Sequence, residues 1–217
     1  MHPVLSQEES AVHKGAHAVD PVVKHSVWRT SIRFTIVTAI LLGIVYPLVI
    51  TGLARVLFPR QAAGSLILKN GQVIGSELLA QSFTSDKYFH PRPSAAGNGY
   101  DATSSGGSNL AQSNKALVQR IQGDIDKLAK ENPGKPVPID MVTTSASGLD
   151  PDITPDNALY QAPRIAAARR ISEAALRQLI AAHTRARDLG VFGESRVNVL
   201  ELNLALDQTD FSASNRN

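Results

Sequence analysis

The sequence predicts an α+β protein, with one N-terminal transmembrane helix followed by a single mixed α/β extracytoplasmic domain that contains a small sheet. Three observations predict this arrangement. An uncharged apolar run lies near the N-terminus, the rest of the chain contains both helical and strand patterns, and no strand–helix–strand repeat of the doubly wound type is visible. About 160 of the 217 residues follow the run, which is enough for one domain with a hydrophobic core.

The apolar run extends from Phe34 to Ala54 without an acidic or basic residue. Its 21 residues would form a helix about 30 Å long, which matches the hydrocarbon core of a bilayer. Arg33 and Arg55 flank the run, and their long side chains could reach the headgroups. We therefore expect a transmembrane helix over residues 27–58. A cleaved secretory signal is the alternative, but its apolar core would span only about 7–15 residues.

Charge bears on orientation and partners. Four cations precede the span and three follow it closely, which slightly favours a cytoplasmic N-terminus and an exported domain. From Pro59 onward, 17 Lys and Arg balance 16 Asp and Glu, so no nucleic acid is expected as a partner. No acid lies between Asp20 and Glu77, which favours contact with anionic lipids of the bilayer. The chain has no cysteine, which is compatible with a bacterial periplasm.

The chain ends and the surface of the span complete this outline. We expect residues 1–26 to be a disordered cytoplasmic tail and residues 208–217 a flexible C-terminus. Compact side chains recur every four residues along the span and could let a partner helix approach closely, although such residues are also common in membrane helices generally. A bend is expected at the proline of this set, and the absence of charge argues against an ion path through the span. The set is Thr35, Ala39, Gly43, Pro47 and Thr51.

The first half of the domain shows three elements. Two β-type runs flank Asn70-Gly71, a dipeptide that suits a type I′ turn, so residues 65–75 predict a β-hairpin. Apolar residues at helical spacing predict an amphipathic helix over residues 109–132, which a proline-rich stretch ends. β-branched residues then predict an extended segment from Ile139 to Thr144.

The second half contains two helix starts and a closing element. Thr154-Pro155 opens a helix that should run to about Arg170, and Ser172-Glu173 opens another that should run to Ala182. Residues 197–206 alternate and then cluster their apolar positions, which indicates a closing strand or short helix.

Few residues suggest chemistry. The loop from Arg92 to Asn114 is rich in Gly, Ser and Asn, and its amides could hold a nucleotide phosphate, but no Gly-Lys-Ser or Gly-Lys-Thr follows and turns requiring positive φ explain the glycines equally well. An acid–base set of His90, Asp86 and Asp101, or a nucleophile at Ser104 or Ser105, lacks any motif that fixes its geometry. We therefore expect no catalytic residue and no metal site. Four polar residues of the second helical region could meet an anion or form a solvated face: Gln161, Arg164, Arg169 and Arg170.

Five segments carry a resemblance to a known family. They are LLGIVYPLVITGLARVLFP, QAAGSLILKNGQVIGSELLAQSF, YFHPRPSAAGNGYDATSSGGSNLAQSN, SASGLDPDITPDNALYQAPRIAAAR and GVFGESRVNVLELNLALD. Together they resemble the C subunit (KdpC) of the bacterial Kdp potassium-importing P-type ATPase, over residues 28–207. The first 27 residues do not match and look like an additional tail, and Phe192 and Ser195 depart slightly from the usual loop.

The resemblance implies a non-catalytic, single-pass subunit of the bacterial inner membrane, with an exported domain. Its partners would be an ATP-hydrolysing subunit, a potassium-channel-like subunit and a small membrane subunit, so that the complex handles ATP and potassium and this chain binds no cofactor by itself. The family is described as a catalytic chaperone that raises the ATP affinity of the ATPase subunit, and this attribution falls on Gln161. Exported placement would separate Gln161 from cytoplasmic ATP, which favours assembly and extracytoplasmic gating instead. The remaining partner-interface candidates are Tyr88, Arg92, Ser108 and Asn109.

A membrane-anchored periplasmic binding protein or hydrolase is the alternative function. It predicts a closed pocket lined by convergent polar groups, whereas a subunit predicts an exposed patch near the hairpin and residues 88–114.

Overall fold

A computed structural model describes residues 21–209, with side chains from residue 27 onward. The chain divides at Ala62–Ala63 into two units, which are described separately. Most of the predicted tail and C-terminal segment, residues 1–20 and 210–217, lies outside the described residues.

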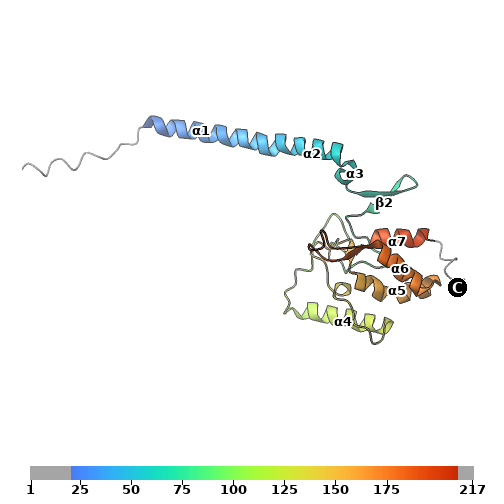
Figure 1. Cartoon of the computed structure of the whole chain (residues 1–217). Coiled ribbons are helices and arrows are strands. Elements are labelled where there is room, and N and C mark those ends of the chain that lie inside the picture. The colour runs from blue at the N-terminus through green and yellow to red at the C-terminus, as the bar shows by residue number, and fades with distance from the viewer. Residues whose placement is uncertain (1–20, 210–217) are drawn as a thin grey trace, which may run out of the picture. The chain divides into compact units, whose positions relative to one another are not determined.

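The first unit is a long apolar helix. α1 (Pro21–Ile40), a π-helical turn η1 (Leu41–Val45) and α2 (Tyr46–Leu57) follow one another without interruption (Figure 1). Within the described residues, Val27–Leu57 is the one helix long and apolar enough to cross a membrane, which agrees with the predicted span. The helix begins at Pro21, inside the segment predicted to be a tail. Proline is well tolerated in a first helical turn, so nothing prevents this earlier start.

The π-helical turn ends at Val45, two residues before Pro47, where we predicted a bend. Proline has no N–H to donate to the carbonyl of Gly43, and its ring would clash with that carbonyl in a regular α-helix. The backbone N–H of Tyr46 instead bonds the carbonyl of Leu41, five residues earlier. The helix therefore accommodates the proline by a local change in its hydrogen-bond register.

The second unit starts with the predicted β-hairpin, after the short helical turn α3 (Pro59–Ala62). β1 (Leu66–Lys69) pairs antiparallel with β2 (Gln72–Ser76). Asn70 and Gly71 form the turn with φ angles of 53° and 78°, as a type I′ turn requires. The register shifts within the hairpin, so that Ile74 forms a bulge.

A three-stranded antiparallel sheet and three helices form the core. The strand order is β3 (Asp152–Ile153), β5 (Arg196–Asn198) and β4 (Thr184–Arg185). The helices α5 (Pro155–Arg169), α6 (Glu173–His183) and α7 (Val199–Gln208) lie side by side (Figure 1). The largest fully buried apolar side chains come from these helices, from β5 and from one loop residue: Phe89, Ile165, Leu176, Ile180, Val197, Leu202 and Leu206.

The helix starts were predicted from capping residues, and the structure confirms them. The Thr154 hydroxyl accepts from the Asn157 N–H at 3.1 Å, and the Ser172 hydroxyl accepts from the Ala175 N–H at 3.2 Å. Asn198 is the last residue of β5 and the N-cap of α7. Residues 197–206, for which we expected either a strand or a short helix, therefore contain the end of a strand followed by a helix. A side-chain acceptor at each start satisfies an N–H that the helix itself leaves unpaired.

The predicted amphipathic helix is α4 (Lys115–Glu131). It begins later than residue 109 because the Asn114 side chain accepts from the Ala116 N–H and caps it there. The apolar face of α4 is only half-buried. Two hydrogen bonds join its end to α5, from the Tyr160 hydroxyl to the Leu128 carbonyl and from the Asn132 amide to the Tyr160 carbonyl.

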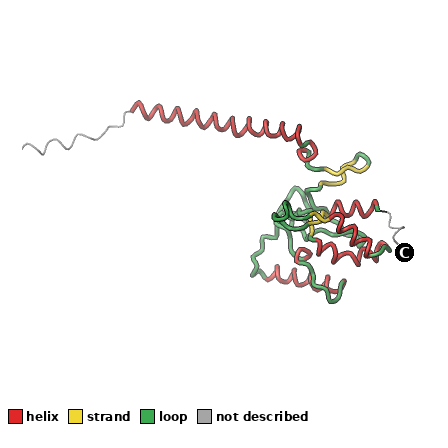
Figure 2. The backbone as a smooth tube through the Cα atoms, in the orientation of Figure 1, coloured by secondary structure: helices red, strands yellow, loops and turns green. Residues whose placement is uncertain are grey.

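The prediction of an extended segment from Ile139 to Thr144 is wrong. These residues begin with the 3-10 turn η2 (Ile139–Met141), and the Thr143 hydroxyl bonds back to the Ile139 carbonyl at 2.8 Å. The cause is tertiary, because the buried Asp140 carboxylate turns inward to bind Thr154. Figure 2 shows that loops such as this one make up much of the second unit.

Candidate functional site

The buried side chain of Gln161 on α5 binds both backbone groups of His90. Its Oε1 accepts from the His90 N–H at 2.8 Å, and its Nε2 donates to the His90 carbonyl at 3.0 Å. Oε1 also accepts from Arg164 at 2.7 Å, and Nε2 also donates to Oδ1 of Asn157 at 2.7 Å. An amide has two donor hydrogens and two acceptor lone pairs, so all four positions are occupied. A ligand could bind Gln161 only by replacing one of these partners.

Asn203 on α7 binds both backbone groups of Phe89, the residue before His90, in the same way. Its Oδ1 accepts from the Phe89 N–H at 2.8 Å, and its Nδ2 donates to the Phe89 carbonyl at 2.9 Å. We call Gln161 and Asn203 together the amide clamp. The clamp fixes two consecutive residues of an irregular segment whose backbone has no strand partner, which explains how Phe89 can be fully buried there.

Two arginines of α5 form further hydrogen bonds to the backbone of this segment, at residues 86–88. Arg164 donates to the carbonyls of Asp86 and Tyr88 at 2.8 and 3.1 Å, and Arg169 donates to the Lys87 carbonyl at 2.7 Å. The Arg169 guanidinium also lies over the ring of Tyr88, 4.8 Å from its centroid. These arginines therefore act on the chain's own carbonyls, not as a solvated face.

A buried polar network continues from the clamp. The Asp140 carboxylate accepts from the Thr154 N–H at 2.8 Å, from its hydroxyl at 3.1 Å and from Nδ2 of Asn157 at 3.0 Å. Asn157 in turn accepts from Gln161. The network joins η2, the start of α5 and residue 90. Since its members satisfy one another, it serves as a structural support for the clamp.

His90 lines a cavity of about 430 Å³ together with the clamp residue Gln161. Its Nε2 lies 3.1 Å from the Ser85 carbonyl. Burial lowers the pKa of His90, and the nearby positive charge of Arg164 lowers the pKa further. His90 is therefore held toward its neutral form.

The Gly-, Ser- and Asn-rich loop is anchored on residues 144–150. Arg92 forms an ion pair with Asp150 at 3.0 Å, and the Ser94 hydroxyl donates to the Gly148 carbonyl at 2.6 Å. Gly148 has a φ of 66°, and a side chain there would meet backbone atoms of Gly106 and Ala96 at less than 3 Å. The absence of a side chain at Gly148 therefore lets this segment pack closely against the backbone of the loop.

Comparison with known proteins shows which protein family this chain resembles. The model of the family KdpC, described as "K+-transporting ATPase, c chain", matches residues 28–208. A potassium-transporting ATPase KdpC subunit from Acidobacterium capsulatum is 61% identical over 181 residues, covering 83% of this chain and 97% of the relative. Another from Koribacter versatilis is 58% identical over 180 residues, covering 83% and 93%.

The chain belongs to the KdpC family. The match includes the apolar helix, the clamp and the glycine-rich loop, so the resemblance predicted from the five sequence segments is confirmed. The first 27 residues lie outside the matched range, as expected.

The candidate reactive groups do not come together in this KdpC chain. His90 has Asp86 near it, but the exposed Asp101 bonds Thr103 at 2.7 Å, which lowers the pKa of Asp101. The Ser105 hydroxyl donates to the Ser147 carbonyl. Among the side chains that the structure describes, from residue 27 to 209, no group of three or more His, Asp or Glu could hold a metal ion.

The partner-interface candidates differ in exposure. Asn109 is exposed, whereas Tyr88, Arg92 and Ser108 are half-buried. Tyr88 donates its hydroxyl to Asp207 at 3.1 Å, and Arg92 is paired with Asp150, so both are engaged within the domain. On the apolar helix, Thr35, Ala39, Gly43, Pro47 and Thr51 are all exposed. The helix remains the larger exposed candidate surface.

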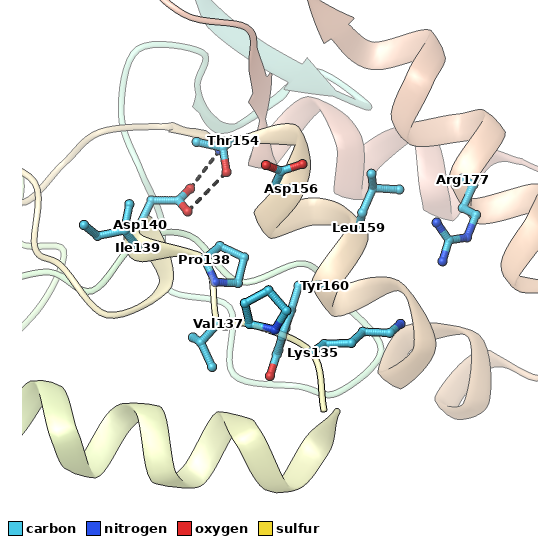
Figure 3. A pocket seen from close by; sticks show the side chains of 11 residues that line it. Lys135, Val137, Pro138, Ile139, Asp140, Thr154, Asp156, Leu159, Tyr160 and Arg177 are labelled. Carbon is cyan, nitrogen blue, oxygen red and sulfur yellow. Dashed lines mark hydrogen bonds between the residues drawn. The ribbon is translucent and has the colours of Figure 1, made fainter. Parts of the chain in front are cut away.

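An open hollow between α5 and residues 135–140 was not predicted. Its volume is about 610 Å³ (Figure 3). Pro138, Leu159 and Tyr160 give it apolar walls, while Lys135 and Arg177 contribute positive charge. In Figure 3 the Asp140 carboxylate points toward Thr154, to which it is bonded. It is not the closed pocket with convergent polar groups that a binding protein or hydrolase would need.

The amide clamp was also missed by sequence reasoning. Gln161 was identified only through the family resemblance, and Asn203 was not identified. The one available signal was a polar residue at an otherwise apolar position of each helix, since Asn203 lies within Val199–Leu206.

Proposed function

We propose that this chain is a non-catalytic subunit of a bacterial potassium-transporting ATPase, anchored in the inner membrane by one helix. The observation that carries the proposal is the family match over residues 28–208, shared with proteins named as potassium-transporting ATPase KdpC subunits. The candidate catalytic side chains engage internal partners, which supports placing ATP hydrolysis in another chain.

We further propose that the domain lies outside the cytoplasm and assembles the complex by contacts of its helix and its exposed surface. The slight excess of cations before the span supports this orientation. The chain's partners would be an ATP-hydrolysing subunit, a potassium-channel-like subunit and a small membrane subunit.

Any effect on the ATP affinity of the complex would then be indirect. The four hydrogen bonds of the Gln161 amide support this view, because they leave no position for a nucleotide. The role of Gln161 would be to hold the surface formed by residues 86–92 in shape.

Two experiments test the proposal. Affinity purification of the full chain in mild detergent should recover a large potassium-stimulated ATPase, and recovery of this chain alone would refute the subunit role. Orientation is tested with single cysteines in this cysteine-free chain. Gln112→Cys should react with an impermeant thiol reagent once the outer membrane is permeabilised, whereas Ser6→Cys should react only after cell lysis. The reverse pattern would place the domain in the cytoplasm.

A further inference from the structure

We propose that one face of the β1–β2 hairpin rests on the bilayer, at the boundary between lipid headgroups and acyl chains. This hairpin face consists of Leu66, Leu68 and Val73. The inference rests on the proposed membrane insertion of Val27–Leu57 and on no other part of the proposed function.

The hairpin face is apolar and exposed. Leu66 and Leu68 alternate with Ile67 along β1, so they point to the same side. Val73 is the cross-strand partner of Leu68 and shares that side. The exposed fractions of Leu66, Leu68 and Val73 are 43%, 63% and 57%. Three neighbouring large apolar side chains exposed on a short hairpin indicate a surface that something else covers.

The rest of the domain holds the hairpin by its other side. Gly75, the partner of Ile67, lies so close to Leu200 on α7 and to Gln81 that a side chain would not fit. Gln81 donates to the bulged carbonyl of Ile74 at 3.0 Å. At the start of the hairpin, Ser76, the partner of Leu66, donates its hydroxyl to the Gly64 carbonyl at 2.7 Å. These contacts fix the hairpin and leave its apolar face outward.

The length of the chain keeps the hairpin near the membrane. Residues 58–65 separate the apolar helix from β1, and four of them form the helical turn α3. At about 1.5 Å per helical residue and 3.5 Å per extended residue, this connection spans at most about 25 Å. The hairpin cannot move far from the bilayer surface.

Charge favours lipid as the occupant over a protein surface. No acidic residue occurs between Asp20 and Glu77, while Lys69 lies on the hairpin itself and is exposed. An apolar surface on a hairpin that carries Lys69 and has no acidic residue within its strands or turn suits the interface of an anionic bilayer. A second exposed apolar cluster, Leu189, Val191 and Phe192, lies between Asp188 and Glu194 and has no such bias.

The test uses the full chain reconstituted in vesicles of phosphatidylcholine and phosphatidylglycerol. A single cysteine replaces Leu68, and an environment-sensitive fluorophore is attached to it. We expect blue-shifted emission and a loss of fluorescence that grows with the fraction of brominated lipid. The matched control is Val118→Cys on α4, an apolar position that is 56% exposed and should not be quenched. A third label, at Leu42→Cys in the apolar helix, reports insertion of the span.

The outcomes separate the two proposals. Quenching at positions 42 and 68 but not at position 118 supports the hairpin contact. Quenching at position 42 alone overturns it while leaving the membrane anchor intact, and failure at position 42 overturns both. Shielding at position 68 that appears only after partner subunits are added, without bromolipid quenching, assigns the face to a protein and also overturns it.

The contribution of charge has its own variant. Lys69→Glu should reduce the quenching at position 68 in vesicles containing phosphatidylglycerol and change it little in phosphatidylcholine alone. Lys130→Glu, an equivalent charge reversal on exposed α4, should leave the quenching unchanged. Equal quenching in the Lys69→Glu and Lys130→Glu variants would remove anionic lipid from the proposal.

Discussion

Gln161 and Asn203 lie on different helices, yet their side-chain amides bind the backbones of two consecutive residues, His90 and Phe89. Gln161 uses α5 as its support and Asn203 uses α7. The segment between them has no strand to pair with, so the two amides replace a strand partner.

Gln161→Ala should destabilise the domain by about 2–4 kcal/mol, because it leaves buried groups of His90 and Asn157 without a partner and removes one acceptor of Arg164. Thermal unfolding of the detergent-solubilised full chain, followed by circular dichroism, measures the effect. Gln122→Ala on exposed α4 is the control and should change the stability by less than about 0.5 kcal/mol. Equal effects of the two substitutions would contradict a structural role for the clamp.

The two clamp residues should be coupled energetically. Once one amide is removed, residues 89–90 can detach, and the second amide loses part of its value. Combining Gln161→Ala with Asn203→Ala should therefore destabilise the domain less than the sum of the single changes, by at least about 0.5 kcal/mol. Gln122→Ala combined with Asn203→Ala should be additive. Strict additivity for Gln161 and Asn203 would show that they act independently.

Stability should fall on mild acidification, partly through His90. Its folded-state pKa is lowered by burial and by Arg164, so the unfolded chain binds more protons between the folded pKa and about 6.5. The contribution of neutral His90 is complete above that range and is lost as the pH falls toward the folded pKa. Asp152 acts in the opposite sense at lower pH, because burial raises its pKa. His90→Gln should flatten the dependence of stability on pH between about 7 and 5. An unchanged slope would rule out this contribution.

Alanine substitutions at Gly148 and Gly134, which both have a positive φ, distinguish the cost of backbone strain from the cost of a steric clash. Gly148→Ala places a methyl group 2.6 Å from the Gly106 carbonyl oxygen, whereas Gly134→Ala meets open space. Gly134→Ala should cost about 1 kcal/mol from backbone strain alone. Gly148→Ala should cost about 3 kcal/mol or more, because backbone must also move. Comparable melting temperatures for the two variants would contradict the packing argument.

Two glycines of the apolar helix, Gly43 and Gly52, allow a controlled test of which helix face contacts a partner subunit. Gly43 belongs to the set of compact residues that repeats every four positions, and Gly52 lies on a different face. A Cβ atom added at either glycine would have no neighbour within 4 Å among the described residues. Gly43→Leu should reduce recovery of the potassium-stimulated ATPase with this chain, because a large side chain blocks close helix approach. Gly52→Leu should leave recovery unchanged. A loss caused by Gly52→Leu alone would move the helix contact to the other face.

Local sequence signals predicted the elements that have local causes. Asn70-Gly71 gave the hairpin, and Thr154 and Ser172 gave two helix starts, because a turn or a cap depends on a few neighbouring residues. The error at residues 139–144 has a non-local cause, since Asp140 bonds Thr154, fourteen residues later. The clamp is non-local too, with Gln161 71 residues from His90. No periodicity reveals such pairs.

The order of synthesis along the chain delays the folding of residues 86–92. Asn203 follows Phe89 by 114 residues and belongs to the last helix of the described chain. Because synthesis starts at the N-terminus, residues 86–92 cannot form these hydrogen bonds until residue 203 has been synthesised. During that interval the segment is open to proteases and to wrong pairing, and loss of the final helix would leave it in that unfinished condition permanently.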